Sequence, residues 1–220
     1  MTIGTLHYVC DPLCGWCYGA TRIVRAAAAI EGLTLRVHCG GLFAGRNARV
    51  MDADMRAFVI AADPRVTAIS GQAFGAAYRS GLLAADDVRL DSLPPTRAVL
   101  AAERLAGKGL AMLEAVQHAH YFEGSRVVET ATLDSLAQGI GLSLEAFRSA
   151  RETIGDDDVM EHISDSQLLL HRYGGAGFPT FILEQNDHWQ MLNHQRHYGN
   201  PEGWSALLRE KLGVMLSPSH

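Results

Sequence analysis

The beginning of the chain shows, in order, the hydrophobic patterns that are typical of a strand, a helix and a second strand. Ile3 to Val9 is mostly apolar and predicts a strand, and the Ala-, Ile- and Val-rich stretch from Gly19 to Ile30 predicts a helix. After Gly32, Leu33 to His38 alternates apolar and polar residues as a strand does. Residues 3 to 38 are therefore expected to form a βαβ unit whose two strands are parallel neighbours.

Between about Leu42 and Gly155 the spacing of apolar residues becomes helical, without clear strands. Helices are predicted for Arg97 to Leu105, Gly109 to Phe122, Leu133 to Ile140 and Leu144 to Glu152. Pro94-Pro95 is expected to begin the first of these helices, and Thr132 and Ser143 are candidate N-caps. The middle of the chain is therefore predicted to be a helical block.

The last part of the chain returns to a mixture of helix and strand. The predicted elements are a helix at about Asp157 to Tyr173, strands at Thr180 to Glu184 and His188 to Leu192, and a helix from Pro201 to Leu212. Asn186 and Asp187 are residue types that favour a tight turn, and they are expected to join the two strands as a hairpin. The order of elements is thus β-α-β, a helical insertion, then α-β-β-α.

Composition limits the partners of this chain. Its 220 residues are 48% hydrophobic and 20% charged, which fits one sizeable globular domain or a core domain with a large insertion. The net charge of -5, without a Lys/Arg cluster, argues against nucleic acid and anionic membranes as partners. No stretch approaches the roughly 20 apolar residues of a membrane span, and the N-terminus lacks a signal-peptide pattern. We expect a soluble, cytoplasmic protein.

The tetrapeptide Cys14-Gly15-Trp16-Cys17 lies between the first predicted strand and helix. A helix N-terminus favours an anion, so the thiolate of Cys14 is expected to be stabilised, and Cys17 lies one turn on, where it can close a disulfide. The chain has four cysteines, too few for a secreted disulfide scaffold, and in a reducing cytosol such a pair is catalytic or metal-binding more often than structural. A zinc site would need two more ligands, and no second CxxC exists.

These features together resemble a known family. The element order, with CxxC after the first strand and a proline beginning the third, resembles the thioredoxin fold, and the insertion resembles that of its DsbA-like branch. The resemblance covers nearly the whole chain. Three motifs are similar to those of cytoplasmic DsbA-like protein-disulfide isomerases: Asp11 to Gly19, Gly40-Gly41-Leu42 and Gly177 to Phe181. We expect residues 1–41 and 156–220 to form the thioredoxin-like domain and residues 42–155 an all-helical insertion domain.

The resemblance implies a thiol–disulfide oxidoreductase or isomerase. Cys14 would attack and Cys17 would resolve the mixed disulfide, without any organic cofactor or metal. Pro179 would be a cis proline packed against the disulfide, leaving the backbone of Phe178 free to pair with substrate, and Trp16 would border the same surface. The partners would be protein or small-molecule disulfides and dithiols, glutathione included. Neither the redox potential nor the choice between monomer and homodimer follows from the sequence.

The proton route departs from the family pattern. Thioredoxin-like proteins often place a buried carboxylate six residues before the nucleophile, and here that position is Tyr8. Asp11 is the candidate substitute as proton relay, and His7 and His38 are further alternatives.

Two alternatives involve the remaining cysteines. Cys10 and Cys39 are expected at corresponding ends of the two parallel strands. They would be either two small buried apolar side chains or a second redox pair. Cys10, Cys14 and Cys17 also have the C-x3-C-x2-C spacing by which radical-SAM enzymes hold a [4Fe-4S] cluster. A third alternative is a non-redox binding protein or isomerase, because 2-hydroxychromene-2-carboxylate isomerases look similar but lack the cysteine pair.

Overall fold

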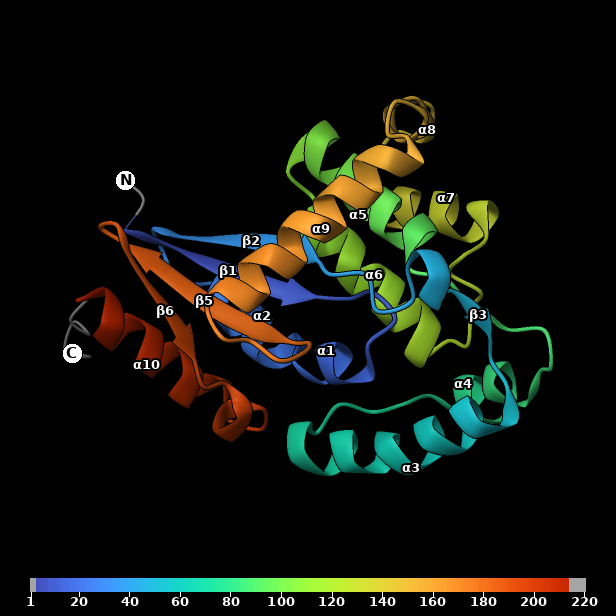
Figure 1. Cartoon of the computed structure of the whole chain (residues 1–220), viewed down its shortest axis with the longest axis horizontal. Helices are drawn as coiled ribbons and strands as arrows, with labels where there is room; N and C mark the ends of the chain where they lie inside the picture. The colour runs from blue at the N-terminus through green and yellow to red at the C-terminus, as the bar shows by residue number, and fades with distance from the viewer. Residues whose placement is uncertain (1–2, 214–220) are drawn as a thin grey trace.

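A four-stranded mixed sheet forms the centre of the protein in the computed structural model, which describes residues 3–213 (Figure 1). Its strand order is β2-β1-β5-β6, with bounds Leu33–Cys39, Gly4–Cys10, Thr180–Gln185 and His188–Leu192. β1 and β2 are parallel, and the other neighbouring pairs are antiparallel. The register places Cys10 opposite Cys39, at the end of the sheet where β1 runs into the CxxC segment.

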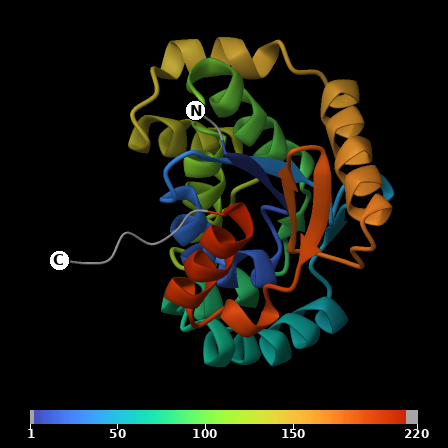
Figure 2. The ribbon, with the colours of Figure 1, turned by 90° about the vertical axis from the view of Figure 1, so that its left-hand side faces the viewer.

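Helices cover both faces of the sheet (Figures 1 and 2). On one face, α9 (Asp156–Arg172) contributes Leu170 to a small cluster with Val9 of β1 and Ile182 of β5. On the other face, α2 (Thr21–Ala28) and α10 (Pro201–Leu212) pack into the main core against even-numbered residues of β1 such as Tyr8. Successive side chains of β1 therefore enter different layers, as strand geometry requires.

The insertion between β2 and α9 is built mainly of helices. They are α3 (Ala53–Ser70), α4 (Ala76–Ser80), α5 (Leu93–Ala106), α6 (Gly109–Tyr121), α7 (Thr130–Gly139) and α8 (Leu144–Glu152). Figure 1 shows α5 to α8 gathered beyond one end of the sheet, whereas α3 runs along the lower side of the molecule. The helical block is confirmed, but β3 (Arg49–Val50) and β4 (Arg89–Leu90) form a short antiparallel ribbon, so the insertion is not entirely helical.

The first predicted helix is divided in two. α1 (Gly15–Gly19) begins directly after Cys14 and is separated from α2 by Ala20, so the helix starts earlier than the sequence pattern indicates. The Thr21 hydroxyl donates to the Tyr18 carbonyl at 2.7 Å, and the Tyr8 hydroxyl donates to the Cys17 carbonyl at 3.2 Å. Side-chain donors on helix carbonyls account for the break.

Most predicted boundaries agree with the structure. Ser143 caps α8 by accepting the Ala146 N–H, and Asn186 and Asp187 both have positive φ, as a type I′ hairpin turn requires. The prediction of Thr132 as an N-cap is wrong. α7 begins earlier in the chain, because the Leu133 N–H already donates a hydrogen bond to the Glu129 carbonyl. The division at residues 41 and 155 stays a prediction. Within residues 3–213, no helix is both long and apolar enough to cross a membrane.

Candidate active site

The CxxC motif lies where β1 ends and α1 begins. Cys14 has extended backbone geometry (φ -98°, ψ 114°) and occupies the N-cap position, and its carbonyl accepts the Tyr18 N–H at 3.0 Å. Cys14 is 6% exposed, whereas Cys17 is completely buried one turn into the helix. This difference in access fits the predicted order, in which Cys14 attacks and Cys17 resolves.

Cys17 is held in its protonated form. Burial and the hydrogen bond with the Cys14 thiol raise the pKa of Cys17 well above its usual value, and a hydrogen bond from the Asp11 backbone offsets this only in part. A thiol must lose its proton before it attacks a disulfide. The site therefore needs a proton acceptor close to Cys17.

Asp11 provides a buried carboxyl group that can serve as this proton acceptor. Its Oδ1 accepts hydrogen bonds from the Leu13 N–H at 2.8 Å and the Ser92 hydroxyl at 3.1 Å, and its Oδ2 accepts the Leu42 N–H at 2.7 Å. Burial raises the pKa of Asp11 to about 7, although the hydrogen bonds act in the opposite direction. Its charge also acts on Cys17. An acid with this pKa can accept or release a proton near neutral pH.

The other candidates for the proton route are placed differently. Tyr8 is buried, stacks on Phe181 and donates to the Cys17 carbonyl, and burial raises the pKa of Tyr8 well above 10, so it stays protonated. His7 hydrogen-bonds His38 at 2.9 Å and Glu184 at 3.1 Å. Alternation along β1 puts His7 on the face covered by α9, opposite Tyr8, and His38 of β2 stacks on His162 of α9.

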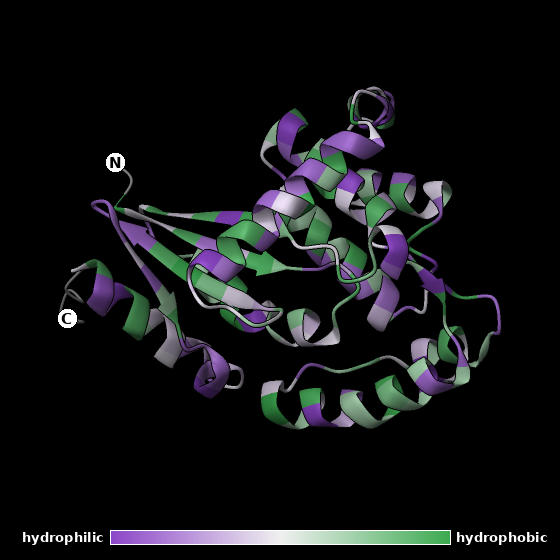
Figure 3. Ribbon diagram, in the orientation of Figure 1, coloured by the Kyte–Doolittle hydropathy of each residue, from purple (hydrophilic) through white to green (hydrophobic). Residues whose placement is uncertain are grey.

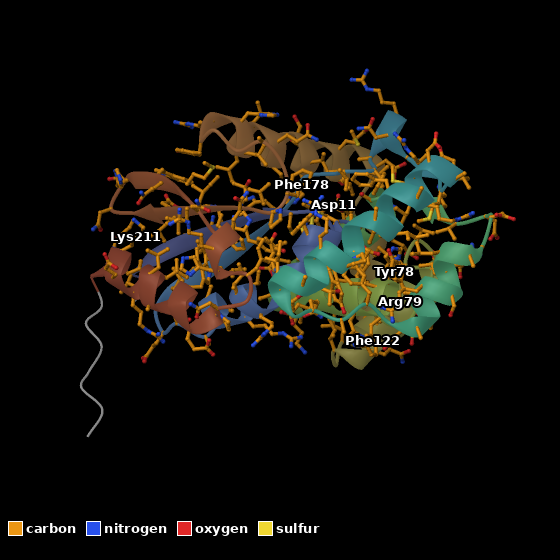
Figure 4. The ribbon with its side chains drawn as sticks, turned by 90° about the horizontal axis from the view of Figure 1, so that it is seen from below. Asp11, Tyr78, Arg79, Phe122, Phe178 and Lys211 are labelled. Carbon is orange, nitrogen blue, oxygen red and sulfur yellow. The ribbon has the colours of Figure 1, made fainter. Side chains whose placement is uncertain are left out.

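The Phe178–Pro179 peptide is cis, as the resemblance implies. The Phe178 carbonyl accepts a hydrogen bond from the Cys14 thiol, with 3.7 Å between sulfur and oxygen. Phe178 and Asp11 come from loops at the same end of the sheet (Figure 4), because β5 runs antiparallel to β1. The structure thus brings both loops to the nucleophile.

Gly40 explains why the Gly40-Gly41 pair occurs together with the Phe178 motif. A Cβ atom at Gly40 would collide with the ring of Phe178. The Gly40 N–H donates to the Cys10 carbonyl at 2.7 Å, and Gln167 donates to the Gly40 carbonyl at 2.8 Å, so the backbone cannot move aside easily. Two motifs separated by more than a hundred residues are therefore parts of one surface.

Two cavities flank this surface. One, of about 550 Å³, is lined by Cys14, Gly15 and apolar residues of α3, and the other, of about 810 Å³, is lined by Pro179 and the loop after β6. Trp16 and Phe178 border both cavities. Figure 3 shows apolar residues along α3, of which Phe58 is 69% exposed. The three residues expected at the substrate surface, Trp16, Phe178 and Pro179, therefore lie together.

Cys10 and Cys39 form a second, inaccessible pair of thiols. Both are completely buried, and a hydrogen bond between their side chains lowers the pKa of Cys39 to about 6, assisted by His162, whereas burial raises that of Cys10. The Cys39 N–H also donates to His162 Nε2 at 3.0 Å. All four cysteines are free thiols in the structure.

The radical-SAM alternative is wrong. In the described part of the chain, no three His, Cys, Asp or Glu side chains are arranged so that they could hold a metal ion. The central sheet has four strands of mixed direction, whereas the radical-SAM fold repeats strand and helix around a partial barrel.

The family model of the DSBA-like thioredoxin domain matches residues 5–197. The chain belongs to this family. No curated protein sequence matches the chain significantly.

Among solved structures, the cytosolic disulfide reductase DsbM from Pseudomonas aeruginosa is 42% identical, with a TM-score of 0.88 over 96% of this chain and 100% of that one. A structure of the same reductase with GSH is 41% identical, with a TM-score of 0.84 over 95% of this chain and 99% of that one. A 2-hydroxychromene-2-carboxylate isomerase shares the fold alone, at 16% identity and a TM-score of 0.57 over 96% of this chain and all of that one.

These comparisons confirm the DsbA-like thioredoxin fold with its insertion. The chain is a thiol–disulfide oxidoreductase, as the CxxC motif and the family together indicate.

Proposed function

We propose that this protein is a cytosolic disulfide reductase whose electron donor is glutathione. The observation that carries the proposal is the likeness, at 42% identity over nearly both chains, to a protein described as a cytosolic disulfide reductase, whose structure was also solved with GSH. The geometry supports it, because Cys14 is the one active-site thiol with access to solvent and lines the 550 Å³ cavity, while Trp16 and Phe178 border both this cavity and the 810 Å³ one.

The first step uses Cys14 and the cis-proline loop. The Cys14 thiolate attacks one sulfur of the substrate disulfide, a bond forms between Cys14 and that sulfur, and the other sulfur leaves as a thiolate that takes up a proton. The Phe178 carbonyl, which accepts from the Cys14 thiol in the free protein, is then available to a backbone N–H of an extended substrate. Trp16 and Phe178 position the two substrate arms in the two cavities.

The second step needs Cys17 and Asp11. Cys17 transfers its proton toward the Asp11 carboxylate and attacks the Cys14 sulfur, so that the Cys14–Cys17 disulfide forms and the second substrate thiolate leaves. Burial of both groups supports this pairing, since it raises the pKa of the thiol and of the acceptor alike. Asp11 then returns the proton to the leaving thiolate.

Glutathione completes the cycle. One glutathione thiolate attacks the Cys14–Cys17 disulfide and forms a mixed disulfide, and a second releases glutathione disulfide and restores both protein thiols. Two electrons thus pass from two glutathione molecules to one substrate disulfide.

Turnover of a neutral disulfide tests the proposal. Reduction of 2-hydroxyethyl disulfide by glutathione, followed through NADPH consumption with glutathione reductase, is expected to be catalysed by the wild-type protein and to return to the uncatalysed rate in Cys14→Ser. A wild-type rate equal to the uncatalysed rate would contradict the proposed function.

A further inference from the structure

Asp63, on α3, is a buried carboxyl group that the reaction above does not use. It is 7% exposed, and its Oδ2 is buried without a hydrogen-bond partner among the described residues. The side chain also hydrogen-bonds Tyr78, which lies beside Arg79 on α4 (Figure 4). An unpartnered oxygen is costly in a protein interior. Because Oδ2 itself has essentially no exposed surface, a donor on a ligand would reach the carboxyl group through the part of Asp63 that lines the 550 Å³ cavity.

This carboxyl group lies beside the CxxC motif. A Cβ atom built on Gly15 would be 3.5 Å from Asp63 Oδ1, and both residues line the 550 Å³ cavity together with Cys14. Among residues 3–213, Asp63 is the only acidic residue that lines this cavity, and the basic side chains in the lining are His120 and His171. Burial lowers the pKa of His120 to about 4, so His120 is neutral at neutral pH. The cavity next to the nucleophile therefore carries one acidic group and, among the described residues, no lining lysine or arginine.

Asp63 is ionised at neutral pH. Burial raises its pKa to about 6, while the hydrogen bond with Tyr78 and the charge of Arg79 lower it. Arg79 does not line the cavity, so the charge of Asp63 is available to a ligand that enters. Inside an apolar cavity, a hydrogen bond between this carboxylate and a cationic donor is stronger than the same contact in water.

We propose that Asp63 binds a protonated amine on the substrate, so that the cavity selects small disulfides and mixed disulfides with an ammonium group near the reacting sulfur. This inference rests on the proposed function, because it names the substrate class of the same site. The cavity volume suits one arm of peptide-fragment size, whose sulfur lies at Cys14 while its ammonium group reaches Asp63. The other arm would lie in the cavity beyond Trp16 and Phe178.

Single-turnover rates with matched disulfides test this assignment. The protein is reduced with dithiothreitol, freed of it, and mixed with cystamine, which carries an ammonium group on each arm, or with neutral 2-hydroxyethyl disulfide. Thiol trapping follows the oxidation of Cys14 and Cys17. We expect Asp63→Asn to lower the ratio of the cystamine rate to the hydroxyethyl disulfide rate about tenfold, because one charge-assisted hydrogen bond is lost. The rate with the neutral disulfide should stay within about twofold.

Asp54→Asn is the matched control, since Asp54 lies exposed on the same helix and does not line the cavity. It is expected to leave the ratio unchanged. An unchanged ratio in Asp63→Asn, or an equal loss with both disulfides, would overturn the inference and assign Asp63 a structural role. A wild-type protein that reacts with neither disulfide would instead contradict the proposed function itself.

A measurement on the wild-type protein alone covers the case in which Asp63→Asn does not fold. N,N′-diacetylcystamine has the same sulfur spacing as cystamine but no charge. The rate with each disulfide is divided by the rate at which free glutathione reduces the same disulfide, and the wild-type protein is expected to give a higher normalised rate with cystamine than with the diacetyl compound. Equal normalised rates would contradict a role for Asp63.

Discussion

The Oδ2 atom of Asp11 lies 2.7 Å from the backbone nitrogen of Leu42. This hydrogen bond joins the loop after β1 to the loop after β2, and Oδ1 of the same carboxyl group holds Ser92 at the start of α5. One buried acid thus links the CxxC segment to the insertion. The same group is the proposed proton acceptor for Cys17, so its substitution should affect both stability and exchange.

Stability should depend on pH through Asp11. Burial raises the pKa of Asp11 to about 7 in the folded protein, from 3.8 for the free group. The stability that the protonated form contributes is therefore complete below about pH 4 and is lost as the pH rises to about 7. Each pKa unit corresponds to about 1.4 kcal/mol, so the change amounts to a few kcal/mol. Urea unfolding at pH 5 and pH 8 should show a smaller pH effect in Asp11→Asn, and identical effects would contradict the assignment.

The proton route should run through Asp11 and not through Tyr8. Tyr8→Phe removes one hydrogen bond, to the Cys17 carbonyl, and is expected to cost about 1 kcal/mol of unfolding free energy with little change in the rate at which Cys17 resolves a mixed disulfide. Asp11→Asn should slow that step and remove its inflection near pH 7. Rapid mixing of each reduced variant with excess disulfide, followed by acid quenching and mass spectrometry, measures how fast the mixed disulfide at Cys14 forms and decays. The reverse pattern would identify Tyr8 as the group that matters.

Substitutions of the two active-site cysteines should have different effects on disulfide exchange. Cys14→Ser is expected to lose all exchange, since no other active-site sulfur reaches solvent. Cys17→Ser should still react with a disulfide but accumulate the mixed disulfide at Cys14, which mass spectrometry of the intact protein detects. A non-redox member of the fold would keep its function in Cys14→Ser.

Position 40 should not tolerate even the methyl side chain of alanine. Gly40→Ala forces a Cβ atom against the ring of Phe178, and overpacking of this kind costs about 1–3 kcal/mol. The displaced loop should also lower kcat/KM for disulfide reduction. Gly139→Ala is the control, because Gly139 lies in a helix with nothing within 4 Å of its added Cβ atom, and helix propensity favours alanine there. Equal behaviour of the two variants would contradict the tight contact.

Much of this architecture could be predicted from local pattern. Long periodic segments such as α8 and α10, and the hairpin turn at Asn186-Asp187, carry their own signals in spacing and turn chemistry. α3 is harder to delimit, because Asp63-Pro64 interrupts its apolar pattern, and two-residue strands such as β3 are too short to show a period.

The site was predictable only in part, for a physical reason. Cys14 and Cys17 lie together in one motif, so their chemistry is visible in the sequence. Ser92 and Asp63 reach the same site through packing of the insertion against the sheet, and nothing local to either residue indicates that contact. A single acid in an otherwise apolar stretch is the signal that could have singled out Asp63.

The central claim is that Cys14 and Cys17 form the working disulfide, and a glutathione redox titration tests it most directly. Thiol trapping and mass spectrometry would assign the state of each cysteine at every glutathione ratio. The structure predicts one reversible two-electron transition confined to Cys14 and Cys17, with the completely buried Cys10 and Cys39 reduced throughout. Failure of Cys14 and Cys17 to form a reversible disulfide would contradict the account.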